Sequence, residues 1–124
     1  MISDKKISVV IPVYNIGKKI LDFLKNIPDY VDKIYLVDDK CPLGTGKIVE
    51  KNLKEFKNLE ILFNDKNLGV GGAVKIGYIE SLKNEFDIIV KIDGDDQMNP
   101  KQINKLVGPL LENYDYVKGN RFLE

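Results

Sequence analysis

The sequence contains no His, no Trp and a single Cys, and Arg121 is its only Arg. Without His the chain cannot build a serine-type catalytic triad or the usual zinc sites, and it lacks the most common general base. The lone Cys41 cannot form a disulfide within the chain, which fits a reducing compartment. Any chemistry therefore depends on carboxylates, Lys, Tyr, backbone amides or a metal ion bound by oxygen.

The sequence also lacks a surplus of charge, because its 19 basic and 19 acidic side chains cancel. Domains that bind nucleic acid through its phosphates usually carry a basic excess, so we expect no nucleic-acid partner. No apolar run approaches the roughly 20 residues of a membrane span, and the N-terminus lacks a signal-peptide core. With 124 residues, the sequence predicts one cytoplasmic domain over residues 1–124.

Short β-branched and apolar runs alternate with longer amphipathic stretches. The predicted strands are residues 7–11, 33–37, 59–63, 87–92 and 114–118. The predicted helices are residues 18–26, 47–56 and 74–82, and a fourth from Pro100 to about residue 113. This order predicts an α/β fold with a mostly parallel sheet and helices on both faces. Ligands of such sheets bind beyond the carboxyl ends of the strands.

Acidic side chains follow two of the predicted strands. Asp38 and Asp39 end the second strand, and Asp93, Asp95 and Asp96 follow the fourth. We expect these five carboxylates to converge on one rim, where a bound cation would relieve their mutual repulsion. The Asp-x-Asp spacing suits Mg²⁺ or Mn²⁺, which binds one or two carboxylates and completes its shell with substrate phosphates. The alternative is a turn in which Asp and Gly merely favour the geometry.

Other residues near the strand ends have a structural and a functional interpretation. In the Asp38-Asp39 pair, a carboxylate can accept hydrogen bonds from a ribose or base, or cap the next turn, and we expect one role for each Asp. The Gly-rich helix start at Gly69 offers amides to an anion, or lets the helix pack closely. Lys75 and Arg121 are the cations best placed to face a phosphate.

Five motifs taken together resemble family 2 glycosyltransferases of the GT-A fold. They read VVIPVYN at 9–15, VDD at 37–39, NLGVGGA at 67–73, DGDDQMNP at 93–100 and KGNRF at 118–122. Within the family the chain is most similar to polyprenyl-phosphate sugar transferases of the dolichol-phosphate mannose synthase type. That similarity rests on the small residues between Gly69 and Gly77, on Gln97 and on Arg121.

The resemblance implies the Rossmann-like nucleotide-binding half of a GT-A fold and a metal-dependent glycosyltransferase. A nucleotide-sugar would be the donor, and a polyprenyl phosphate at the cytoplasmic face of a membrane is a candidate acceptor. The expected donor-site residues are Pro12, Tyr14, Asn15, Asp39, Gly69, Asp93, Gly94, Asp95, Gln97 and Arg121. Asp93 and Asp95 would bind Mg²⁺ or Mn²⁺, Asp39 would meet the base and Arg121 a phosphate. No catalytic base is evident. Residues 40–46 depart from the family's usual loop, which leaves the identity of the nucleotide base open.

Members of the resembled family are considerably longer than this chain. We therefore expect an N-terminal donor-binding portion, truncated at its C-terminus, that turns over little substrate and self-associates through an exposed sheet edge at the fifth strand. The alternative function is a noncatalytic nucleotide-binding fragment. A flavodoxin-like receiver domain is a weaker alternative, because its acidic pair follows the first strand, which here ends in PVYN at 12–15.

Overall fold

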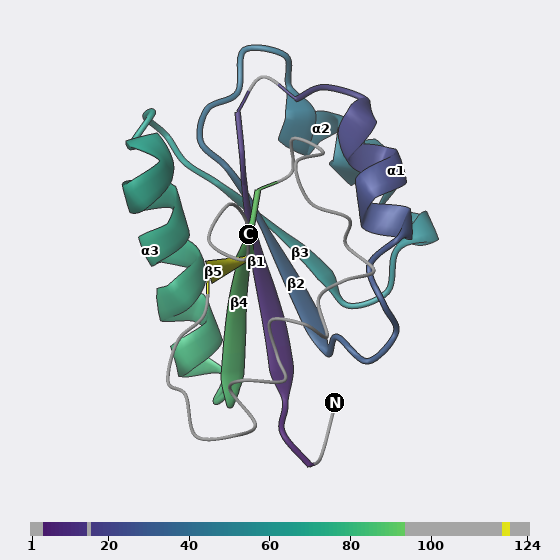
Figure 1. The fold of residues 1–124 in the computed structure, drawn as a ribbon. Coiled ribbons are helices and arrows are strands. Elements are labelled where there is room, and N and C mark those ends of the chain that lie inside the picture. The colour runs from purple at the N-terminus through teal and green to yellow at the C-terminus, as the bar shows by residue number, and fades with distance from the viewer. Residues whose placement is uncertain (1–3, 15, 94–117, 120–124) are drawn as a thin grey trace.

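A parallel β-sheet with helices on both faces forms the part of the chain described by the computed structural model, residues 4–14, 16–93 and 118–119 (Figure 1). The strands are β1 (Ile7–Val13), β2 (Lys33–Asp38), β3 (Leu59–Phe63), β4 (Ile88–Ile92) and β5 (Lys118–Gly119). The helices are α1 (Lys19–Lys25), α2 (Thr45–Lys51) and α3 (Gly69–Lys83), with a 3₁₀ turn at Leu53–Glu55. Among the described helices none is long and apolar enough to cross a membrane.

The strands lie in the order β3-β2-β1-β4-β5, and each neighbouring pair is parallel. The predicted fold class is therefore confirmed, and Lys118 of the predicted fifth strand lies in β5 at one edge of the described sheet. From β1 the chain builds outward to β2 and β3, then crosses back to β4 on the other side. Strand order reverses between β1 and β4, which is where sheets of this type bind ligands.

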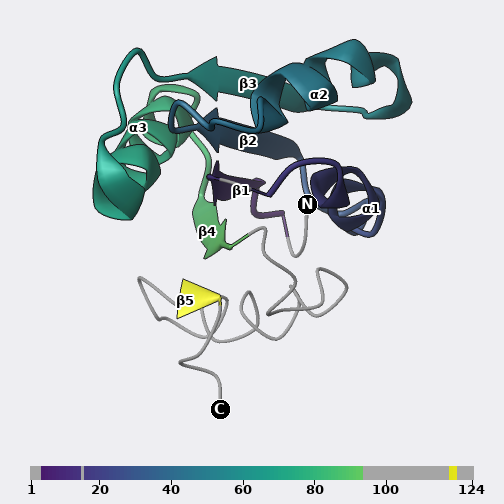
Figure 2. The same cartoon turned by 90° about the horizontal axis from the view of Figure 1, so that it is seen from above.

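Side-chain alternation along the strands divides the core into two layers, because successive residues of a strand point to opposite faces. One layer lies under α1 and α2 and includes Val9, Leu36 and Val90. The other lies under α3 and includes Val10, Tyr35 and the partly buried Ile89. Figure 2 shows α3 on one side of the sheet and α1 and α2 on the other.

The central strand β1 extends two residues further than predicted and contains Pro12. Its pairing with β2 continues to Val13, whereas its pairing with β4 ends at Val10. Pro12 therefore lies beyond the described pairing with β4, where its missing N–H removes no hydrogen bond from that ladder. The two strands at the reversal of strand order thus stop pairing before the carboxyl edge.

The helix predicted over residues 47–56 is wrong at both ends. α2 begins at Thr45 and ends at Lys51, and the 3₁₀ turn follows it. Phe56 is extended and packs on the core under α1 and α2, so the chain must leave the helix before it to enter β3. α3 begins at Gly69, inside the Gly-rich segment and five residues before the predicted range of 74–82. The helix predicted after Pro100 lies outside the described residues.

Helix α3 packs very closely on β1. A Cβ atom built at Gly77 would collide with the side chain of Val10, so this position has room only for Gly. One turn further along, the buried hydroxyls of Ser8 and Ser81 are 2.8 Å apart and form a hydrogen bond between the strand and the helix. These contacts fix the position of α3, and with it the start of the helix at the carboxyl edge of the sheet.

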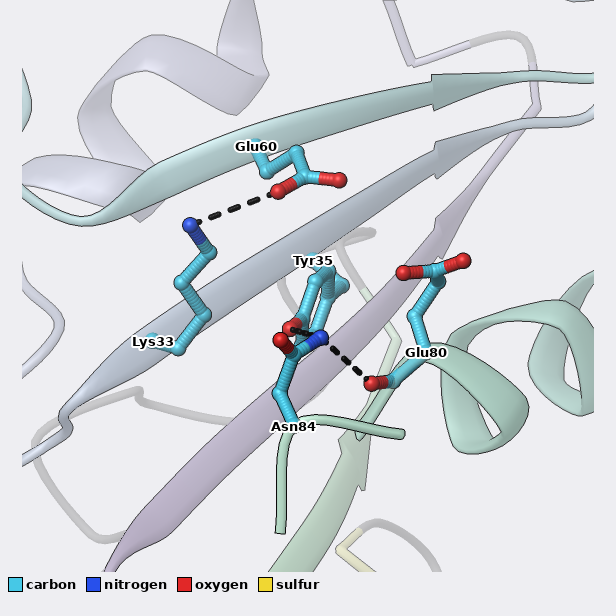
Figure 3. Close-up of polar contacts among 5 residues, drawn as sticks. All are labelled: Lys33, Tyr35, Glu60, Glu80 and Asn84. Atoms are coloured by element: carbon cyan, nitrogen blue, oxygen red, sulfur yellow. Dashed lines mark hydrogen bonds and ion pairs between the residues drawn. The ribbon is translucent and has the colours of Figure 1, made fainter. Parts of the chain in front are cut away.

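A polar cluster lies where the end of α3 covers β2, at the edge opposite the strand ends that carry the motifs (Figure 3). The Asn84 side-chain amide donates to the Tyr35 hydroxyl at 3.0 Å, and Lys33 forms a 3.4 Å ion pair with Glu60. Burial, and next the negative charge of Glu60, raise the pKa of the Tyr35 phenol above its ordinary value, against the smaller opposite effect of the Asn84 hydrogen bond.

Candidate functional site

The predicted donor-site residues that the structure describes lie on the α3 side of the carboxyl edge. A small pocket there is lined by Pro12, Val13, Tyr14, Asp39 and Ala73. Pro12 and Tyr14 come from the end of β1, Asp39 follows β2, and Ala73 belongs to the second turn of α3. The pocket thus joins two strand ends to the start of a helix, beside the reversal of strand order.

Asp38 points away from this pocket. It continues the alternation of Ile34 and Leu36 toward α2, where its Oδ2 accepts the Gly46 N–H at 2.7 Å and its Oδ1 accepts the Cys41 N–H at 2.7 Å. The expected convergence of five carboxylates is therefore wrong for Asp38, because adjacent residues of a strand face opposite sides. Asp38 has the capping role expected for one member of the pair, and it explains why α2 begins early.

Asp39 faces α3 and is 4% exposed. Its Oδ1 accepts hydrogen bonds from the Leu68 N–H at 2.7 Å and the Asn64 side-chain amide at 2.8 Å, and its Oδ2 accepts the Gly69 N–H at 2.8 Å. The carboxylate is thus held at the positive end of the α3 dipole. Asp39 lines the pocket and also caps a helix that begins 30 residues later, whereas its expected contact with a ribose or base stays a prediction.

Gly69 has a conformational reason to be glycine. Its φ of +78° lies in the left-handed region, where a side chain is unfavourable. Its N–H already donates to Asp39 and, at 2.9 Å, to the Asn67 side-chain oxygen. The Gly69 amide is therefore already satisfied by a carboxylate from within the chain.

Asp93 follows β4 on the same α3 side of the sheet. Its Oδ1 is 2.7 Å from the Lys91 ammonium, and the Asp93 side chain is 24% exposed. The sequence reasoning did not identify Lys91 as a partner of Asp93, although a Lys inside the apolar run before Asp93 was a visible signal. Asp38, Asp39 and Asp93 are all compensated by groups of the chain, so these three carboxylates do not by themselves require a cation.

Asp93 can supply only part of the coordination shell of a hard divalent cation. In the described part of the chain no group of three His, Cys, Asp or Glu side chains could hold a metal ion. Mg²⁺ sites commonly use one or two carboxylates and take further oxygens from water and substrate phosphate, so a partly exposed Asp93 at a strand end is compatible with one. The remaining predicted site residues lie outside the described residues: Asn15, Gly94, Asp95, Gln97 and Arg121.

A second and larger cavity lies at the opposite, amino-terminal edge of the sheet. It is lined by the end of α1, the start of β2 and the segment before β3, including Leu24, Ile34 and Phe56. None of the predicted site residues lines it. We place the functional site at the smaller pocket, because parallel sheets bind ligands at their carboxyl edge and the candidate residues gather there.

The sequence profile of Glycosyl transferase family 2 matches residues 8–124. The chain belongs to this family. The family expected from the five motifs is thus confirmed, and the match includes every strand except the first residue of β1.

Relatives and a solved structure agree with this assignment. The chain is 31% identical over 133 residues to the UDP-N-acetylglucosamine–dolichyl-phosphate N-acetylglucosaminyltransferase of Methanococcus voltae, covering 96% of this chain and 53% of that protein. It is 28% identical over 118 residues to the undecaprenyl-phosphate mannosyltransferase of Micrococcus luteus, covering 94% of this chain and 48% of the relative. The crystal structure of S. aureus TarS 1-349 superposes with a TM-score of 0.65 at 27% identity, covering 86% of this chain and 32% of that one.

The expected similarity to polyprenyl-phosphate sugar transferases is confirmed by these relatives. The chain spans about half the length of the curated relatives that it matches. In this family 2 chain, the structure shows the parallel sheet and the pocket beside Asp39.

Proposed function

We propose that this chain provides the donor-binding half of a metal-dependent glycosyltransferase that transfers a sugar from a nucleotide-sugar to a polyprenyl phosphate at a membrane surface. The observation that carries the proposal is the pocket formed by Pro12, Tyr14 and Asp39 in a family 2 chain. Asp93 follows the neighbouring strand on the same side of the sheet. The names of the two relatives support the acceptor class.

Each described side chain has a chemical task in this proposal. Tyr14, which is 45% exposed, and Pro12 give the pocket apolar surface suited to a nucleoside base. Asp39 is fixed by its three donors, so a hydrogen bond from the base to this carboxylate requires no further ordering of the side chain. Asp93 lies across β1 from this pocket, where the diphosphate would extend toward β4.

Asp93 and Asp95 would hold Mg²⁺ or Mn²⁺ together with oxygens of the diphosphate. When bound, the ion offsets the negative charge that develops on the departing nucleoside diphosphate. An oxygen of the acceptor phosphate forms a bond to the anomeric carbon while the bond from that carbon to the diphosphate breaks. A phosphate acceptor is already anionic near neutral pH and needs little help from a general base, whereas a hydroxyl acceptor would need a carboxylate base.

A transfer assay with labelled sugar nucleotides, polyprenyl phosphate and Mn²⁺ tests the proposal. Because the chain supplies only the donor-binding half, we expect metal-dependent nucleotide binding with at most slow formation of a labelled lipid product. Both should be lost on chelation of the metal, and lost in an Asp95→Asn variant that still folds. Nucleotide binding without transfer would favour the alternative, a noncatalytic nucleotide-binding fragment. Absence of both nucleotide binding and transfer would contradict both functions.

A further inference from the structure

Lys91 is the most deeply buried partner in the ion pairs of the described residues. Its side chain is 10% exposed, and its ammonium lies 2.7 Å from Asp93 Oδ1. The Lys residues in the other described pairs are 29 to 67% exposed, at 3.4 to 3.9 Å from their partners. Ile89 and Lys91 lie on the same face of β4, so Lys91 emerges from the core under α3.

Stability alone does not explain a Lys at this position. An ammonium group loses its hydration when it is buried, and a buried ion pair is often no more stable than apolar residues of similar volume. β4 otherwise consists of Ile and Val, which would continue the apolar layer. The carboxylate that Lys91 contacts is, however, the first acid of the proposed metal-binding motif. The position of Lys91 is therefore informative about that motif.

We propose that Lys91 is a positioning residue and internal counter-ion for Asp93, which makes cation binding depend on the nucleotide. This inference rests on the proposed function. The ammonium orients the Asp93 carboxylate before a ligand arrives, and its positive charge opposes a divalent cation at that carboxylate. A nucleoside diphosphate adds negative charge to the site, so the cation binds well only together with it.

Mn²⁺ affinity measured without nucleotide is the direct test, for example by electron paramagnetic resonance of free Mn²⁺. The Lys91→Met variant should bind Mn²⁺ alone at least about tenfold more tightly than the wild type, because a positive charge close to the ion has been removed. Lys91→Arg retains the charge and should stay within about twofold of the wild type. Lys83→Met, at an exposed Lys near the end of α3, is the matched control and should change nothing.

A purely structural role for Lys91 would give a different result, because a poorly oriented Asp93 cannot bind the ion better. Unchanged or weaker binding of Mn²⁺ alone by Lys91→Met would therefore overturn the inference. If thermal unfolding shows that Lys91→Met does not fold, Lys91→Gln takes its place with the same expected gain. Wild-type protein that binds no Mn²⁺ even with nucleoside diphosphate would instead overturn the proposed metal site itself.

Discussion

At the residue scale, two adjacent carboxylates illustrate how the strand period assigns roles. Asp38 faces α2 and Asp39 faces α3, and each accepts backbone N–H groups at the start of the helix on its own side. The sequence indicates that one Asp would cap a turn, but not that Asp39 also caps a helix, since its partners lie 29 and 30 residues away. These donors hold the Asp39 carboxylate in place where it lines the pocket.

Tyr35 gives a prediction for the pH dependence of stability. Its pKa in the folded protein is raised above the ordinary 10.0, so the unfolded chain loses the phenol proton first. The stabilisation from the neutral phenol is thus fully present below pH 10 and is lost as the pH rises through the folded-state pKa. Urea unfolding between about pH 8 and 11 should show a steeper loss of stability in the wild type than in Tyr35→Phe.

Glu60→Gln is the companion variant for this measurement. Because the Glu60 carboxylate raises the Tyr35 pKa, its neutral analogue should lower the pH at which the folded phenol ionises, as followed by ultraviolet absorbance. Parallel stability curves for wild type and Tyr35→Phe would contradict the assignment.

At the element scale, the placement of α3 depends on small residues against β1. Gly77→Ala should destabilise the protein by about 1–3 kcal/mol, because the new methyl group meets Val10 in a packed core. The matched control is Gly71→Ala in the first turn of the same helix, where a Cβ atom would meet nothing within 4 Å. That change should stabilise the helix by up to about 1 kcal/mol. Urea unfolding of both variants measures these changes in the free energy of unfolding. A Gly77→Ala variant as stable as Gly71→Ala would refute the close packing.

The strands were largely predictable from sequence, whereas the helix ends were not. Apolar runs of strand length located β1 to β4, since buried parallel strands read as continuous apolar segments. The start of α2 at Thr45 was missed because its cap is Asp38 of the preceding strand, a contact that local helix signals do not show. Lys91 was missed for a related reason. A Lys in an apolar run has no evident partner until the strand direction places Asp93 beside it.

At the scale of the whole molecule, the larger core layer and the candidate site lie on opposite faces of the sheet. The layer under α1 and α2 contains most of the fully buried residues, and Asp38 points to that side, where it accepts a hydrogen bond from α2. On the side under α3, Pro12, Tyr14 and Asp39 line one pocket at the carboxyl edge, and Asp93 follows the neighbouring strand β4. Self-association through the sheet edge stays a prediction, which sizing of the protein in solution will test.

The central claim is that nucleotide binds on the α3 side of this edge, and calorimetric titration tests it most directly. Nucleoside diphosphates would be titrated with Mn²⁺ into the wild type, Asp39→Ala and Asp38→Ala, after confirming that each variant is folded. Asp39→Ala should weaken binding by about 1–3 kcal/mol, through loss of the carboxylate that we propose meets the base. Asp38→Ala should lower stability by a similar amount, yet leave nucleotide affinity within about twofold, because Asp38 faces α2. Loss of binding in Asp38→Ala with unchanged binding in Asp39→Ala would contradict the account.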